Sequence, residues 1–405
     1  MQSFHLPGHS LYLTHTHTLA ELRNGVGHLL DRFAHRLPPA QVPLLIKPCL
    51  GLDRPALLGG SSDFRLLVAL FEGLKARGFH TLALAESALP GYHRAGVKPW
   101  RRLRAEKLLA QYGVKLLEVG LLPSTKVELP AGPVRVLREA LEWPMILVSN
   151  VRTHPDLGLA MGAWNLKGLV HPEDRAQLMR AGGEGLLALV QQVQPRLSLL
   201  DLGVVMEGEG PLEGTPRRLD RLLGGEDVLA LDLLATRLLG YTPEEVPTLW
   251  KALHEQVLLP EAQVWLEEKV SSVATLRRLR VQGPAYEVRE VVETWVKGML
   301  RRRSEAKRWQ WMAERLSVRH VVQAEADPPV RLKRTAELCG GCRRCEDFCP
   351  VGLSREEIGL EMKTERCVEC LYCYQVCDRG ALRVEGERGP LLRLIEAHKS
   401  DTERL

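Results

Sequence analysis

The 405-residue chain lacks several features that assign proteins to common classes. The first 22 residues contain no apolar stretch flanked by basic residues, so we expect no signal peptide. No stretch reaches the ~20 apolar residues that cross a bilayer, so we expect no membrane span. A net charge of +5 is small for this length and argues against nucleic acid as a partner. No G-x-G-x-x-G follows an apolar run, so the chain carries no nicotinamide or flavin fingerprint.

Cysteine is nearly absent outside one region near the C-terminus. Eight of the nine cysteines fall in two runs, each with the spacing C-x2-C-x2-C-x3-C. In this spacing a short loop wraps three thiolates around a [4Fe–4S] cluster, and the fourth cysteine of each run binds the other cluster. We therefore predict two [4Fe–4S] clusters as cofactors. The first is assigned to Cys339, Cys342, Cys345 and Cys377, and the second to Cys367, Cys370, Cys373 and Cys349.

Two other interpretations of these cysteines are weaker. Disulfides need an oxidising compartment, and a zinc site usually takes two C-x2-C pairs without a third cysteine at the same step. The segment from Thr335 to Ala381 instead resembles bacterial-type two-cluster ferredoxins. Asp378 stands where that family has a proline, and its negative charge predicts a lower reduction potential for the cluster bound by Cys377. Because a reducing cytoplasm suits eight free thiolates, we expect a cytoplasmic protein.

The length predicts two or three domains. Short apolar runs alternate with helical patterns through the first half, which predicts an α/β fold with a mostly parallel sheet and helices on both faces. We expect an α/β domain over 1–256, a helical connector over 257–329, a small ferredoxin-like α+β domain over 330–385 and a C-terminal tail over 386–405. The expected strands lie at 9–18, 42–47, 81–86, 114–119, 145–149 and 197–202, and the clearest helices at 18–37, 62–77, 101–112 and 226–239.

The connector contains a basic, tryptophan-rich stretch at 295–319. A basic aromatic helix can bind an acidic partner or nucleic acid, but it is more often a docking helix with buried tryptophans and a solvated basic face.

Polar residues follow the apolar runs of the α/β domain. Parallel strands end at one edge of their sheet, where loops and helix N-termini form ligand sites. The residues that we expect at this edge are Lys47, Cys49, Glu86, Asn150, Arg152, His154, Asn165, Lys167, Asp201 and Glu207. The cations among them suit a carboxylate or phosphate, and the carboxylates could hold a divalent metal or act as general acid. For Asp227 and Asp232 we favour a structural role such as helix capping.

Several of these residues stand in motifs of a known family. The motifs are Lys47-Pro48, Thr153-His154, Asn165-Leu166-Lys167-Gly168, Glu207-Gly208-Glu209-Gly210-Pro211 with Gly214-Thr215-Pro216, and Asp227 to Asp232. In these residues, roughly from Leu44 to Leu253, the chain resembles the uncharacterised iron–sulfur proteins of domain of unknown function 362, which are often fused to a ferredoxin module. Three positions depart from the family pattern: Cys49 replaces an asparagine, and Arg152 and Trp164 each replace a lysine. The resemblance implies an architecture but no established reaction.

From these observations we predict an iron–sulfur oxidoreductase that passes electrons from a redox partner protein to a small anionic substrate at the strand ends. The catalytic candidates are His154, as proton donor, with Lys47 and Lys167. The substrate-binding candidates are Arg152, Asn165, Glu86, Asp201 and Glu207. The alternative is a non-catalytic electron carrier or a redox-responsive module that docks a partner protein. For Cys49 a small buried apolar side chain and a thiolate activated by Lys47 both remain open.

Overall fold

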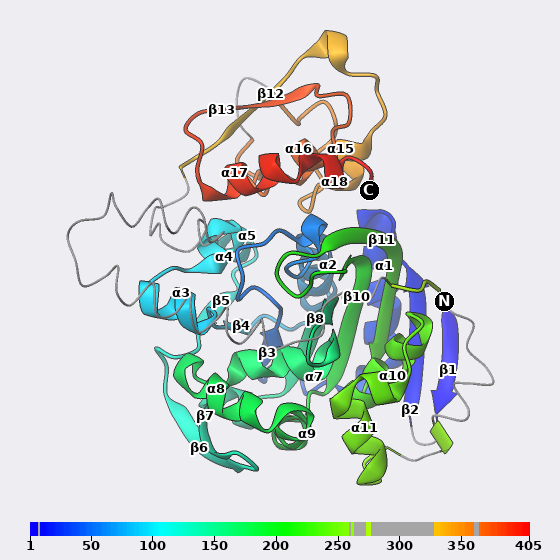
Figure 1. Cartoon of the computed structure of the whole chain (residues 1–405). Helices are drawn as coiled ribbons and strands as arrows, with labels where there is room; N and C mark the ends of the chain where they lie inside the picture. Colours follow the sequence, from blue (N-terminus) through cyan, green and yellow to red (C-terminus); the bar gives the residue numbers. More distant parts are fainter. Residues whose placement is uncertain (7–8, 259–260, 263–272, 277–327, 360–363) are drawn as a thin grey trace.

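The computed structural model describes residues 1–6, 9–258, 261–262, 273–276, 328–359 and 364–405. Most of the predicted helical connector, including the basic stretch at 295–319, lies outside the described residues. In the described part, a large α/β domain carries a smaller C-terminal domain at one end (Figure 1).

The large domain is built on one nine-stranded sheet whose order is β1-β2-β11-β10-β8-β3-β4-β5, with β9 paired to β8. The strands β10, β8, β3, β4 and β5 run parallel, whereas β1, β2 and β11 form an antiparallel edge. The prediction of a mostly parallel sheet is therefore confirmed. The sheet strands are β1 (Gln2–Leu6), β2 (His9–His15), β3 (Leu44–Lys47), β4 (Leu82–Glu86), β5 (Lys115–Glu118), β8 (Met145–His154), β9 (Gly158–Ala160), β10 (Leu197–Glu207) and β11 (Thr215–Gly225), and a separate hairpin pairs β6 (Ser124–Leu129) with β7 (Gly132–Leu137).

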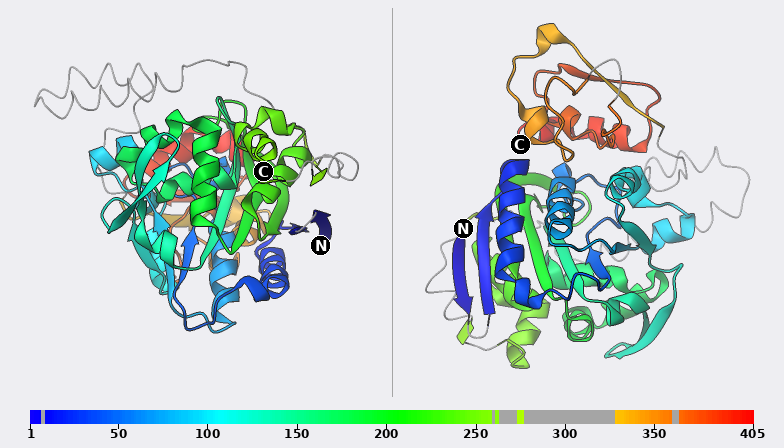
Figure 2. Two further views of the ribbon diagram at one scale, coloured as in Figure 1. Left: turned by 90° about the horizontal axis from the view of Figure 1, so that it is seen from below. Right: turned by 180° about the vertical axis from the view of Figure 1, so that it is seen from behind.

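Helices cover both faces of this sheet, as predicted. The helices α1, α2 and α5 share a hydrophobic core with one face, and α7, α9, α10 and α11 share another core with the opposite face (Figure 2). The helices are α1 (Leu19–Arg32), α2 (Phe64–Lys75), α3 (Pro90–Ala95), α4 (Pro99–Arg102), α5 (Ala105–Gln111), α6 (Arg138–Glu142), α7 (Gly162–Asn165), α8 (Arg175–Arg180), α9 (Gly182–Val193), α10 (Val228–Leu238) and α11 (Pro247–His254).

Local signals explain where the longer helices begin. Thr18 and Glu21 form a capping box at the start of α1. The N-cap of α2 is Asp63, whose side chain accepts from the Arg65 backbone N–H at 2.8 Å. The helix expected over 101–112 is split into α4 and α5, because Arg104 adopts a left-handed conformation with φ 68°.

Two strands are longer than the sequence predicts, and this places polar residues inside the sheet. The expected strand at 145–149 continues to His154, and every residue of β8 is buried. Asn150, Arg152 and His154 alternate along this strand, so their side chains share one face. The expected strand at 197–202 likewise continues to Glu207.

The smaller domain contains the two cysteine runs. Its strands β12 (Arg331–Arg334) and β13 (Leu382–Glu385) pair antiparallel, and a short helix follows within each run, α15 (Arg344–Asp347) and α16 (Tyr372–Gln375). The segment that we set apart as a tail forms α17 (Pro390–Ala397) and α18 (Lys399–Thr402). Thr402 Oγ1 donates to the Gln375 carbonyl at 3.1 Å, so this segment packs back on the cysteine-bearing domain.

The two domains share one hydrophobic core. Phe348, Leu371 and Tyr372 of the smaller domain belong to the same buried cluster as Phe64 of α2. The rings of Phe64 and Tyr372 stack with centroids 5.8 Å apart, and the Arg65 guanidinium lies 4.3 Å from the Phe348 ring centroid. Each buried aromatic side chain contributes about 1.5–3 kcal/mol. The second cysteine run is therefore fixed against the start of α2.

Candidate functional site

The predicted edge of the sheet contains a small cavity of about 30 Å³. Its wall comes from the loop after β3, the end of β4, the strand β8, and α7 with the turn that follows it. The cavity is lined by Cys49, Gly51, Leu52, Glu86, Ser87, Leu89, Arg152, Trp164, Asn165, Lys167, Gly168, Arg175, Pro211 and Leu212. The structure thus brings together Glu86, Arg152, Asn165 and Lys167 of the predicted site.

Lys47 lies directly behind this wall in a buried polar network. Its Nζ is 3.2 Å from both carboxylate oxygens of Glu86 and donates to Asn165 Oδ1 at 3.1 Å. Both charged side chains are almost fully buried, so the pair satisfies two charges that would be costly to bury alone. A Cβ on Gly168 would come within 2.7 Å of Lys47 Nζ, which explains the glycine in the Asn-Leu-Lys-Gly motif.

Arg152 is a buried cation in the cavity wall, with 2% of its surface exposed. Its Nη2 lies 2.5 Å from Cys49 Sγ and 3.3 Å from Asn150 Oδ1, and its Nη1 donates to the Pro211 carbonyl at 3.3 Å. Its Nε is buried and has no partner. The cation beside Cys49 is therefore Arg152, whereas the Nζ of Lys47, which we had considered as the activating group, is engaged by Glu86 and Asn165.

Trp164 connects the cations of the site. The Arg152 guanidinium lies 5.1 Å from its ring centroid, and Lys167 Nζ lies 3.8 Å from it. Its Nε1 is buried and has no hydrogen-bond partner. The motifs identify Trp164 only as a departure from the family pattern, and nothing local in the sequence indicates that its indole N–H is buried without a partner.

His154 does not line the cavity. Its Nδ1 accepts from the backbone N–H groups of Asp156 and Leu157 at 3.1 and 3.3 Å, and its ring packs edge-on against Trp164. Burial, with the nearby charges of Lys167 and Arg152, lowers the pKa of His154 to about 3. At neutral pH the imidazole is therefore uncharged, and it lacks the acidic proton that our prediction of a proton donor required.

Asp201 and Glu207 also lie away from the cavity lining. Asp201 accepts from the Gly203 backbone N–H at 2.7 Å, and burial beside Asp63 raises its pKa to about 7. Glu207 forms an ion pair with Arg217 at 3.2 Å. We had expected both to contact substrate. They are instead held in local contacts because β10 continues past the point where we expected it to end.

The other acidic residues of the motifs have structural contacts. Asp227 caps α10 by accepting from the Ala230 backbone N–H at 2.7 Å, as expected. Asp232 accepts from the backbone N–H groups of Gly162 and Ala163, both at 2.9 Å, at the start of α7. Among the described residues, no three His, Cys, Asp or Glu side chains converge on a site for a single metal ion. The carboxylates of the motifs are thus not gathered as ligands of a divalent metal.

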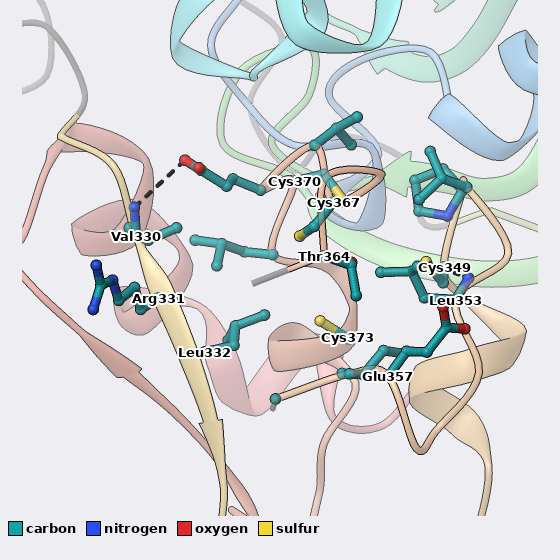
Figure 3. Close-up of a pocket in the computed structure, with 17 residues that line it drawn as sticks. Val330, Arg331, Leu332, Cys349, Leu353, Glu357, Thr364, Cys367, Cys370 and Cys373 are labelled. Atoms are coloured by element: carbon teal, nitrogen blue, oxygen red, sulfur yellow. Dashed lines mark hydrogen bonds between the residues drawn. The ribbon is translucent and has the colours of Figure 1, made fainter. Parts of the chain in front are cut away.

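The cysteines of the second predicted set surround one space. Cys349, Cys367, Cys370 and Cys373 line a cavity of about 60 Å³ together with apolar residues such as Leu332 and Leu353 (Figure 3). Burial and the neighbouring thiols raise the pKa of Cys370 and Cys373 well above the usual value. Four crowded thiols around one space fit a metal cluster, which holds its ligands at its corners and not around a single ion.

The first predicted set is closer to solvent. Burial and the neighbouring thiols Cys342, Cys377 and Cys339 raise the pKa of Cys345 to about 11. Cys342 is exposed, whereas Cys339, Cys345 and Cys377 are partly buried. Cys377, the last cysteine of the second run, is thus near enough to Cys345 to contribute to this shift, and the crossed assignment stays our prediction.

A buried series of contacts joins the second cysteine set to the cavity in the large domain. The Phe64 backbone N–H donates to Tyr372 Oη at 3.2 Å, and Tyr372 lies between Cys370 and Cys373 in the chain. Ser62, two residues before Phe64, accepts from the Cys49 backbone N–H at 2.8 Å. Neither Phe64 nor Tyr372 could be identified from motifs, because their contact joins segments far apart in the sequence.

Two separate parts of the chain match known family models. Residues 44–237 match the family model for domain of unknown function DUF362, and residues 331–378 match a 4Fe-4S dicluster domain. A thylakoid-associated protein of Synechocystis sp., sll1697, is 33% identical over 124 residues, which are 29% of this chain and 39% of that protein. The chain therefore spans about two-fifths of the length of this curated relative.

A crystal structure of a Thermotoga maritima protein aligns with 51% of this chain and 56% of that chain, at 16% identity and a TM-score of 0.31. None of the helices in the described ranges has the length and apolar content needed to cross a membrane. The chain joins a domain of the DUF362 family to a 4Fe–4S dicluster domain, the kind of domain that performs iron–sulfur electron transfer.

Proposed function

We propose that the chain is a cytoplasmic iron–sulfur oxidoreductase, which takes electrons from a redox partner protein and reduces a small anionic substrate in the cavity at the strand ends. Each [4Fe–4S] cluster carries one electron, so two clusters can supply the pair that most reductions of organic substrates need. The eight cysteines of the two runs are the ligands in this proposal.

The observation that carries the proposal is the buried connection between the two sites. Tyr372, Phe64 and Ser62 are each at most 3% exposed, and Cys49 lines the cavity. The contacts from the second cysteine run to the cavity wall are thus made inside the protein, through the Tyr372–Phe64 and Ser62–Cys49 hydrogen bonds. A short buried route of this kind supports electron transfer within the chain.

The polar groups around the cavity have distinct roles in this proposal. Arg152 and Lys167 attract the anion because both line the cavity as cations. Asn165 positions Lys47: its Nδ2 donates to the Val148 carbonyl and to Ser149 Oγ, and its Oδ1 accepts from Lys47. The Lys47–Glu86 pair is our candidate for the proton source of the reduction, in place of His154. His154 acts as a positioning residue through its edge contact with Trp164.

Reoxidation of the reduced protein tests this proposal. Anaerobically purified protein is reduced and mixed with a panel of small carboxylates, phosphates and neutral metabolites while the cluster absorbance is recorded. We expect reoxidation by at least one anionic compound, and we expect Lys167→Gln to slow it. The control is Lys251→Gln, which removes a surface lysine of α11 paired with Glu255 at 3.1 Å.

The alternative function gives a different result in the same experiment. If only a partner protein reoxidises the clusters and no small molecule does so, the chain is an electron carrier and the enzyme proposal is wrong.

A further inference from the structure

Arg152 is a buried guanidinium without a carboxylate partner in the part of the chain that the structure describes. Two other buried arginines have a carboxylate partner, because Arg65 pairs with Asp63 at 2.7 Å and Arg102 pairs with Asp53 at 2.6 Å. The contacts of Arg152 are instead a thiol, an amide oxygen and a carbonyl, and its Nε has none. An unpaired buried charge is strongly destabilising. The arrangement therefore points to an anion that completes it.

A second residue that lines the same cavity has an unpartnered donor. Trp164 is 91% buried, since 9% of its surface is exposed, and its Nε1 has no hydrogen-bond partner. Buried polar groups nearly always have a partner in the protein or in a bound molecule. Because Arg152 and Trp164 both line the cavity, one small acceptor group there could satisfy both donors.

The size and charge of the cavity restrict that group. On the same measure a water molecule needs about 10–15 Å³, so a cavity of about 30 Å³ has room for two water-sized atoms. The carboxylate of Glu86 lies in the same wall. A second negative charge on the ligand would be repelled by it, which favours a singly charged anion over a phosphate dianion.

We infer that this cavity binds the carboxylate group of a small monocarboxylate, with Arg152 Nε and Trp164 Nε1 donating to its oxygens and Lys167 adding a second positive charge. That the bound carboxylate belongs to a substrate rests on the proposed function. That the cavity binds a carboxylate at all rests on the residues of the cavity alone.

Cys49 supplies a direct readout, because its Sγ lies 2.5 Å from Arg152 Nη2 in the cavity wall. Anaerobically purified holoprotein is treated with iodoacetamide, and modification of Cys49 is followed by peptide mass spectrometry. The probes are acetate, its neutral analogue acetamide, and inorganic phosphate. Thermal unfolding with the same three probes gives a second readout that does not need Cys49 to react.

We expect acetate to slow Cys49 alkylation or raise the unfolding midpoint, and we expect acetamide and phosphate to do neither. If acetate and acetamide act alike in both measurements, the anion site does not exist. If phosphate protects at lower concentration than acetate, the carboxylate assignment is wrong.

Trp164→Phe is the variant that tests the geometry, because it keeps an aromatic face for Lys167 but removes Nε1. We expect acetate binding to weaken about tenfold, the usual effect of losing one hydrogen bond to a charged group. Trp250→Phe is the matched control, since Trp250 is 43% exposed on α11. Equal acetate affinity in wild type and Trp164→Phe would remove Trp164 from the site.

The outcomes separate this inference from the proposed function. Acetate binding with no reoxidation by any small molecule of the panel would leave the site and overturn the enzyme proposal. Reoxidation by a substrate without a carboxylate, together with no effect of acetate, would overturn the site and leave the oxidoreductase.

Discussion

Tyr372 Oη accepts a hydrogen bond from the backbone N–H of Phe64 at 3.2 Å, and the two rings stack. Phe64 is the first residue of α2, where helix geometry leaves the backbone N–H groups without partners inside the helix. Tyr372, which lies within the second cysteine run, thus accepts a hydrogen bond from the first N–H group of a helix in the large domain. This contact fixes the dicluster domain to the sheet edge that holds the cavity.

Replacing Tyr372 with phenylalanine removes this acceptor but keeps the stacked ring. We expect Tyr372→Phe to lower the free energy of unfolding by about 1–3 kcal/mol, because the buried Phe64 N–H is left unpaired. The iron content should stay unchanged, since no cysteine is altered. Anaerobic denaturant unfolding and iron analysis measure the two effects.

Tyr374→Phe is the control for this prediction. Tyr374 lies two residues further on, is less buried, and faces Lys399 Nζ at 5.0 Å from its ring centroid. We expect removal of the Tyr374 hydroxyl to change the free energy of unfolding by less than about 0.5 kcal/mol. Equal losses in the two variants would show that the Phe64 contact contributes nothing specific.

Double cysteine variants test the crossed cluster assignment. If Cys349 and Cys367 bind the same cluster, replacing both with alanine should remove one cluster and leave about four of the eight irons expected per chain. Replacing Cys349 and Cys339 should remove both clusters, because these residues then belong to different sets. The reverse pattern in iron content and electron paramagnetic resonance would mean that each run binds its own cluster.

Cys49→Ser is the control for the cluster variants. Cys49 lines the cavity of the large domain and is not among the residues that surround the space of the second cysteine set. We expect this variant to keep about eight irons per chain.

The negative charge of Asp378 should lower the reduction potential of the first cluster, which Cys377 helps to bind. The sequence suggested that its charge lowers the potential of the cluster bound by Cys377, but the structure pairs it with Arg344 Nη1 at 3.1 Å. Asp378 is also about half exposed, so solvent weakens its field. We expect Asp378→Asn to raise that potential by on the order of 20–40 mV, and the other cluster serves as the internal reference in a redox titration. An unchanged or lower potential would contradict the prediction.

Local signals in the sequence predicted most of the fold. The capping box of Thr18 and Glu21 marks the start of α1, and the apolar runs before Lys47 and Glu86 mark β3 and β4. These features depend on neighbours within a few residues, so they can be recognised without the structure. The cysteine spacing is a signal of the same local kind.

The features that the sequence did not predict depend on contacts between distant segments. Arg152 and His154 looked like loop residues because charged and polar side chains rarely occupy a buried strand. They are part of β8 because β10 and β9 pair with it there. The motif predicted that His154 lies near the cavity, but it could not show that Nδ1 faces the backbone of Asp156.

The cavity itself was predicted only in part. The strand-end rule placed Glu86, Arg152, Asn165 and Lys167 at one edge. Lys47 is paired with Glu86, whereas Arg152 has no carboxylate partner among the described residues. The rule could not distinguish these two cations. That distinction needs the positions of side chains from three strands and a helix.

The lowered pKa of His154 predicts a pH dependence of stability. In the folded chain the pKa is about 3, because of burial and the charges of Lys167 and Arg152, whereas an unfolded histidine has about 6.5. Between these values the unfolded chain binds a proton that the folded chain does not, so stability is lost as the pH falls through this window. From pH 7 to pH 5 this loss is about 2 kcal/mol. The unfolding free energies of wild type and His154→Gln are measured with denaturant at each pH. Their difference isolates the contribution of His154, because both proteins share the same carboxylates. His154→Gln should lose less stability on acidification, and parallel pH profiles for the two proteins would show that His154 takes up a proton in the folded state.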